Sequence, residues 1–120
     1  MSVRRQSWIG VALAILFIAA WLALHVGAIF GLTVTVETAG IAAALVLVQA
    51  WLSTALFITA HDAMHGAVAP RWPRLQQALG RCALMIYAGI DFARMAPAHF
   101  DHHKYAGTAG DPDFNARDPR

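Results

Sequence analysis

Residues 39–65 read AGIAAALVLVQAWLSTALFITAHDAMH, and this stretch decides the fold. Its first part, 39–60, carries no charged side chain and is longer than the roughly 20 residues that a helix needs to cross the hydrocarbon core of a membrane. Two histidines, His61 and His65, follow at once. Residues four apart share one helix face, and imidazoles bind transition metals. The stretch therefore predicts a membrane-spanning helix that ends in a pair of candidate metal ligands.

A second predicted span precedes this one. Residues 8–32 also lack charged side chains, and the run is too long for the apolar part of a cleaved signal peptide, which is about 7–15 residues. The connection 33–38 holds no lysine or arginine, whereas basic residues flank the pair of spans on both outer sides. The positive-inside rule then predicts a helical hairpin with the N-terminus and the chain after residue 60 in the cytoplasm.

The composition agrees with a membrane protein. The chain is 58% hydrophobic and only 13% charged, and its net charge of +2 is too small to indicate nucleic-acid binding. Residues 75–90 form a shorter apolar stretch that contains Arg81, which indicates an interfacial or re-entrant helix. We therefore expect an all-α membrane protein, in which a transmembrane hairpin is followed by interfacial or cytoplasmic helices that carry the histidines.

Five of the six histidines fall in two clusters, at residues 61–65 and 99–103, where the second cluster reads HFDHH. Helical spacing places the members of each cluster on a shared face, and both clusters are expected on the cytoplasmic side of the membrane. The predicted metal ligands are His61, His65, His99, His102 and His103. His25 is alone in the first span, and we expect it to hydrogen-bond a neighbouring helix instead.

The residues alone leave the metal and the reaction open. A zinc peptidase helix has a glutamate after its first histidine, and Asp62 takes that place here, so a membrane zinc hydrolase is a remaining alternative. Carboxylate di-iron bundles need several glutamates, and the only one in the chain is Glu37. A non-catalytic segment that only packs against other helices is a further alternative.

Three motifs resemble one known family. Residues 57–66 read FITAHDAMHG, residues 99–103 have the form HxxHH, and residues 107–114 read GTAGDPDF. The two histidine boxes resemble those of the membrane fatty-acid desaturase and hydroxylase superfamily. The HDAMHG motif and the DPDF motif narrow the resemblance to the bacterial-type beta-carotene ketolases. Fatty-acyl desaturases and hydroxylases, which share the fold and the metal, are the close alternative.

This resemblance implies a di-iron centre held by histidines from three boxes, with O2 as co-substrate and a ferredoxin-type electron donor. The substrate would be a carotenoid or another lipid that is oxidised at C4 of a beta-ionone ring, in a multi-pass protein of the bacterial inner membrane. The third box is absent from this chain. We therefore expect residues 1–120 to be the N-terminal part of a single desaturase-like domain, about half of that fold, and to be inactive alone.

Two further sets of residues are predicted around the metal. Aspartates next to the boxes can hydrogen-bond the ligating imidazoles, and these are Asp62, Asp101, Asp111 and Asp113. The turns of the second span below His61 are expected to line a groove for the substrate, and these residues are Ala50, Thr54, Phe57 and Ile58.

Overall fold

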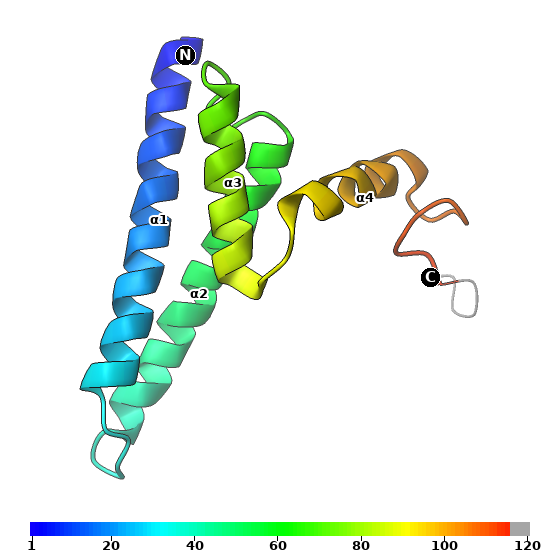
Figure 1. Ribbon diagram of the computed structural model, residues 1–120. Coiled ribbons are helices and arrows are strands. Elements are labelled where there is room, and N and C mark those ends of the chain that lie inside the picture. The colour runs from blue at the N-terminus through cyan, green and yellow to red at the C-terminus, as the bar shows by residue number, and fades with distance from the viewer. Residues whose placement is uncertain (116–120) are drawn as a thin grey trace.

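The computed structural model describes residues 1–115, and all regular structure in that range is helical. The four helices are α1 (Val3–Gly31), α2 (Ala39–Met64), α3 (Pro73–Ala88) and α4 (Phe92–Tyr105). Helices α1 and α2 form a long antiparallel hairpin, α3 lies alongside one half of it, and α4 projects sideways (Figure 1). The predicted all-α class with an N-terminal apolar hairpin is confirmed.

The two hairpin helices are long and apolar enough to span a membrane, with 29 and 26 residues respectively. Large apolar side chains cover their outer surfaces. Leu16 is 58% exposed and Leu47 is 72% exposed within this chain. Such surfaces are stable in lipid and costly in water, so the molecule is a membrane protein. Helix α1 begins at Val3, earlier than predicted, because the Ser2 side chain accepts a hydrogen bond from Arg5 N and caps it.

Polar side chains bridge the two spans within the hairpin. Trp21 Nε1 donates to Ser53 Oγ at 2.9 Å, and Gln49 Nε2 lies 3.5 Å from His25 Nδ1. The His25 ring also stacks on Trp21, with ring centroids 4.4 Å apart. His25 therefore contacts a neighbouring helix, as its isolated position predicted, and it lies outside the histidine clusters.

Helix α2 continues past the apolar run, so the first histidine pair lies on its last turn. The helix ends at Met64, and Gly66 adopts a φ of 78°, a left-handed conformation that favours glycine. Ala67 N donates to Asp62 O at 2.8 Å and closes the turn. The chain is thereby turned back toward the start of α1.

The loop 66–72 after this turn is fixed on α1. Gln6 Nε2 donates to Ala67 O at 3.1 Å, and Arg71 N donates to Ser7 Oγ at 3.1 Å. At Gly10 the contact is closer still, because a Cβ there would lie 1.9 Å from Val68 O. Only a glycine permits this approach between a helix and a loop backbone.

Helix α3 packs against both spans and builds the core with them. Leu56 of α2 and Ala83 and Leu84 of α3 are each 0% exposed. The helix runs along the hairpin rather than across its end (Figure 1). Most of residues 75–90, predicted as an interfacial or re-entrant helix, therefore belongs to a helix that packs along the two spans.

Helix α4 has few packing contacts of its own. Asp91 caps its start, where Asp91 Oδ1 accepts a hydrogen bond from Ala93 N at 2.7 Å. Phe92 is the only buried residue of the helix. Beyond Phe92, the histidines on its far half provide its ring contacts with α2, which makes the histidine cluster part of what positions the helix.

Candidate metal centre

Four histidines from two helices meet at one point. His61 and His65 come from α2, His99 and His103 come from α4, and one ring nitrogen from each lies within 4.8 Å of the others. His99 Nε2 is at the centre, 2.9 Å from His65 Nε2 and 3.1 Å from His103 Nε2. Two boxes that are separated by more than thirty residues of sequence therefore meet at this point, with four of the five predicted ligands in the group; the expectation that His102 shares the face of His99 and His103 is wrong.

The donor set fits a transition metal. Imidazole nitrogens are suitable ligands for iron, zinc, copper and nickel. Two nitrogens that each lie about 2 Å from one metal ion are about 3 Å apart when they bind at right angles, close to the separations at His99. The boxes also lie at the C-terminal ends of α2 and α4, where helix dipoles favour a cation.

His102 lies apart from these four. Its Nδ1 is 2.8 Å from Asp111 Oδ1 and 3.4 Å from Asp113 Oδ2, and the three residues form a second possible metal-binding group. Successive residues are rotated by about 100° on a helix, so His102 and His103 cannot point in the same direction. Of the HxxHH triple, the first and last histidines face the first box and the middle one faces the DPDF run.

The two groups differ in their electrostatics. Burial holds the pKa of His99 below its ordinary value, and the neighbouring His103, His61 and His65 lower it further. The hydrogen bond that His102 donates to the Asp111 carboxylate raises the pKa of His102. The pKa of Asp111 is lowered, first by its hydrogen bond from the backbone of Asp113 and then by His102. The lowered pKa of His99 favours its neutral form, the form that binds metal.

Three of the four predicted aspartates contact a histidine. Asp62 Oδ1 lies 3.1 Å from His61 Nδ1, while Asp111 and Asp113 both contact His102. Asp101 is exposed, and no side-chain contact is found for it among residues 1–115. The Asp62 carboxylate thus contacts an imidazole of the first box through one of its two oxygens.

The predicted groove residues divide between different surfaces. Thr54 and Ile58 line a cavity of about 370 Å³ between α1 and α2 that extends to Asp62. Phe57 instead packs against Tyr87 of α3, with ring centroids 5.6 Å apart. Ala50 lines a separate cavity of about 530 Å³ nearer the hairpin turn. Adjacent helical positions such as 57 and 58 point about 100° apart, which explains the division.

The α1 wall of the Thr54–Ile58 cavity was not predicted. It is formed by small and apolar residues that include Gly10, Leu13, Ala14 and Phe17. Their spacing of i, i+3, i+4 and i+7 is the sequence signal of one helix face. That face carries Gly10, which contacts the backbone of Val68 in the loop 66–72, so the cavity and the loop anchor share one stripe of α1.

An apolar hairpin that brings two histidine boxes to one point defines a class of histidine-rich membrane proteins with a cluster able to bind metal. The chain belongs to the fatty acid desaturase family, whose pattern matches residues 38–120. It is 48% identical over 102 residues to a beta-carotene ketolase of Paracoccus sp. (strain N81106 / MBIC 01143), covering 85% of this chain and 42% of that protein.

Other relatives are algal. A zeaxanthin 4-ketolase of Chlamydomonas reinhardtii is 38% identical over 121 residues, covering 92% of this chain and 27% of that protein. A beta-carotene ketolase of Haematococcus lacustris is 42% identical over 78 residues, covering 64% of this chain and 24% of that protein. The chain thus spans less than half the length of these curated relatives. No solved structure matches it.

Proposed function

We propose that this chain belongs to a carotenoid 4-ketolase, an oxygenase that introduces a keto group at C4 of a beta-ionone ring with O2 and external electrons. One observation carries the proposal: in a chain similar to ketolases, four imidazoles from two boxes lie within 4.8 Å of one another beside an apolar hairpin. A reactive centre next to lipid suits a substrate that dissolves only in lipid.

The metal in this proposal is iron, bound by histidines of both boxes. His61, His65, His99 and His103 would hold one position, and His102 would contribute to a second. Iron supplies the activation of O2 that oxidation of an unactivated C–H bond requires, which acid–base side chains cannot supply. The neutral state favoured at His99 is the state in which an imidazole offers a nitrogen lone pair.

The aspartates would orient the imidazoles. Asp62 holds His61 at Nδ1, and Asp111 holds His102 at Nδ1. In each ring Nε2 is then the nitrogen available to a metal. Such outer partners fix the ring tautomer and raise the basicity of the ligand. Asp113 supports the same arrangement through its backbone N–H, which donates to Asp111 Oδ1 at 2.9 Å.

The substrate would enter from the lipid along α2. Thr54 and Ile58 lie on the turns below His65, and their cavity extends to Asp62, which contacts His61. The lining is largely apolar, so a polyene chain can lie there while water is excluded. Phe57 and Tyr87 would form the opposite flank, nearer α3.

The proposal also includes an orientation and an electron donor. Arg4 and Arg5 precede α1, and the α1–α2 connection holds no basic residue. The positive-inside rule supports a cytoplasmic N-terminus in a bacterial inner membrane, and the histidine boxes lie at that same end of the hairpin. There a soluble donor of the ferredoxin type can reach them.

Expression of the complete gene in bacteria that make beta-carotene tests the function. We expect ketocarotenoids, detected by their absorption and mass, and their loss in the His99→Ala variant. His25→Ala is the matched control, because His25 lies outside the cluster and contacts Gln49 instead. Unchanged beta-carotene in cells that contain the folded wild-type protein would refute the proposal.

A fatty-acyl desaturase is the second candidate, because the family pattern that matches residues 38–120 is that of the fatty acid desaturases. The same cells separate the two functions. Fatty-acid analysis would show new double bonds only if acyl lipids are the substrate. New double bonds together with unchanged pigment would favour this second candidate.

A further inference from the structure

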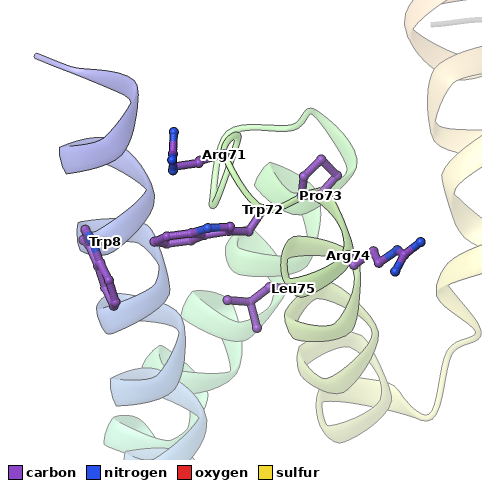
Figure 2. A pocket seen from close by; sticks show the side chains of 6 residues that line it. All are labelled: Trp8, Arg71, Trp72, Pro73, Arg74 and Leu75. Atoms are coloured by element: carbon purple, nitrogen blue, oxygen red, sulfur yellow. The ribbon is translucent and has the colours of Figure 1, made fainter.

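A third cavity lies at the end of the molecule where α1 begins. It has a volume of about 640 Å³ and is lined by residues of α1, of the loop before α3 and of the first turn of α3: Trp8, Arg71, Trp72, Pro73, Arg74 and Leu75. Trp8 and Trp72 meet edge to face, with ring centroids 4.9 Å apart. Figure 2 shows the two rings side by side, with Arg71 beyond them toward the N-terminal end of α1.

Basic side chains surround this cavity. A smaller adjoining cavity is lined by Arg4 and Arg5 and shares Trp8 with it. Within residues 1–115, no carboxylate lies within salt-bridge distance of Arg4, Arg5 or Arg71. The Arg74 side chain points away from the tryptophan pair (Figure 2). Three unpaired positive charges therefore lie beside an apolar, aromatic hollow.

The two halves of the cavity are held in position by backbone contacts. Arg71 N donates to Ser7 Oγ at 3.1 Å, and Ser7 is 0% exposed. Gln6 Nε2 donates to Ala67 O at 3.1 Å. These bonds join the loop to the first turns of α1, so Arg71 and Trp72 are placed next to Trp8 before any ligand arrives. Preorganisation of this kind lowers the entropy cost of binding.

We propose that this cavity binds one anionic phospholipid. The headgroup phosphate would lie between Arg4, Arg5 and Arg71, and the upper acyl chain would lie against Trp8, Trp72 and Leu75. Arginine pairs with phosphate through two parallel hydrogen bonds. Tryptophan is enriched at the depth where headgroups meet acyl chains. The combination of charge and apolar surface selects a lipid over free phosphate, which would leave the aromatic lining empty.

The bound lipid would also have a structural effect. The loop that carries Arg71 and Trp72 follows directly from the turn at Gly66, which ends the first histidine box. A lipid that joins α1 to this loop would hold the end of α2 in place. Binding is therefore expected to stabilise the protein in addition to retaining the lipid.

Binding can be measured on the purified chain in detergent, by native mass spectrometry and by titration with short-chain phosphatidylglycerol or phosphatidylcholine. We expect one phosphatidylglycerol to bind preferentially and to raise the melting temperature. The Arg5→Gln/Arg71→Gln variant should lose about 25-fold in that preference, since each arginine near anionic lipid contributes about five-fold. Arg81→Gln/Arg94→Gln is the matched control, because it removes the same charge elsewhere.

Each outcome decides the proposal. Equal affinity for the two lipids, or an equal loss of preference in both double variants, would show that the arginines act only as general positive charges and would overturn it. Competition by inorganic phosphate at a similar concentration would identify a free-anion site and would also overturn it. A Trp72→Ala variant that keeps its fold should weaken phosphatidylglycerol binding, and unchanged binding would exclude the cavity as the site.

Discussion

At the scale of single residues, the division within the HxxHH triple is the feature with chemical consequences. His99 and His103 face the first box, while His102 is bonded to Asp111. The histidine side chains of one short motif thus point in two directions, as a centre with more than one metal ion would require. From the sequence, all five histidines were predicted as metal ligands without distinction. The directions of their side chains separate His102 from the other four.

The His102–Asp111 contact gives a prediction about pKa values. We expect Asp111→Asn to lower the pKa of His102 toward its ordinary value of 6.5, because the hydrogen bond that His102 donates to that carboxylate is the largest cause of the raised pKa. The pKa can be followed by NMR titration of the histidine ring protons in metal-free protein. Asp101→Asn is the matched control and should leave His102 unchanged.

The same pair makes the 107–114 turn depend on pH, with a sign that follows from both pKa shifts. Because the pKa of His102 is raised, the stabilisation that protonated His102 gives the turn is complete below about pH 6.5. It is lost as the pH rises through the raised pKa. Because the pKa of Asp111 is lowered, the stabilisation that ionised Asp111 gives the turn is present above pH 3.8. It is lost as the pH falls through the lowered pKa. The turn should be most stable between these limits.

At the scale of the elements, the contact between α1 and the loop 66–72 restricts the size of the side chain at residue 10. We expect Gly10→Ala to destabilise the protein by about 1–3 kcal/mol, as overpacking does elsewhere, because the added Cβ would lie 1.9 Å from Val68 O. Thermal unfolding in detergent measures the change. A Cβ at Gly27, on the same helix, would have no neighbour within 4 Å, so Gly27→Ala should not reduce the free energy of unfolding. An equal loss in both variants would contradict the close approach.

Helix α4 is the element that a metal should affect most. Phe92 is its only buried residue, and its histidines provide its ring contacts with α2. We expect iron(II), added without oxygen, to increase the hydrogen-exchange protection of 92–105 while α1 changes little. His99→Ala should remove the increase and His25→Ala should retain it. Equal protection with and without metal would show that α4 is already fixed by packing.

At the scale of the whole molecule, the hairpin brings the start of α1 and the end of α2 to the same end of the molecule. The first histidine box, at the end of α2, therefore lies near the N-terminus, and the α1–α2 connection 32–38 lies at the opposite end of the hairpin (Figure 1). In a Cys82→Ser background, we expect Ser2→Cys and Asp101→Cys to react with a membrane-impermeant thiol reagent from the same side. Thr35→Cys should react only from the other. Labelling of Ser2→Cys and Asp101→Cys from opposite sides would exclude the hairpin.

The sequence by itself determined the class of the molecule. Apolar run length set the two spans, because a bilayer requires a fixed length of helix. Histidine spacing set the face that His61 shares with His65 and the face that His99 shares with His103, because helical periodicity is local. The motifs at residues 57–66 and 107–114 likewise indicated the family from the sequence alone. These features depend only on near neighbours in the chain.

Only the tertiary structure decided which side chains meet. The sequence did not show that His102 turns to Asp111, that Phe57 and Ile58 line different surfaces, or that α1 closes the cavity beside Thr54. Each depends on the path of the chain after Met64, which is set by the contacts of the loop 66–72 with Gln6, Ser7 and Gly10. Such contacts join residues about sixty positions apart, and no local periodicity encodes them.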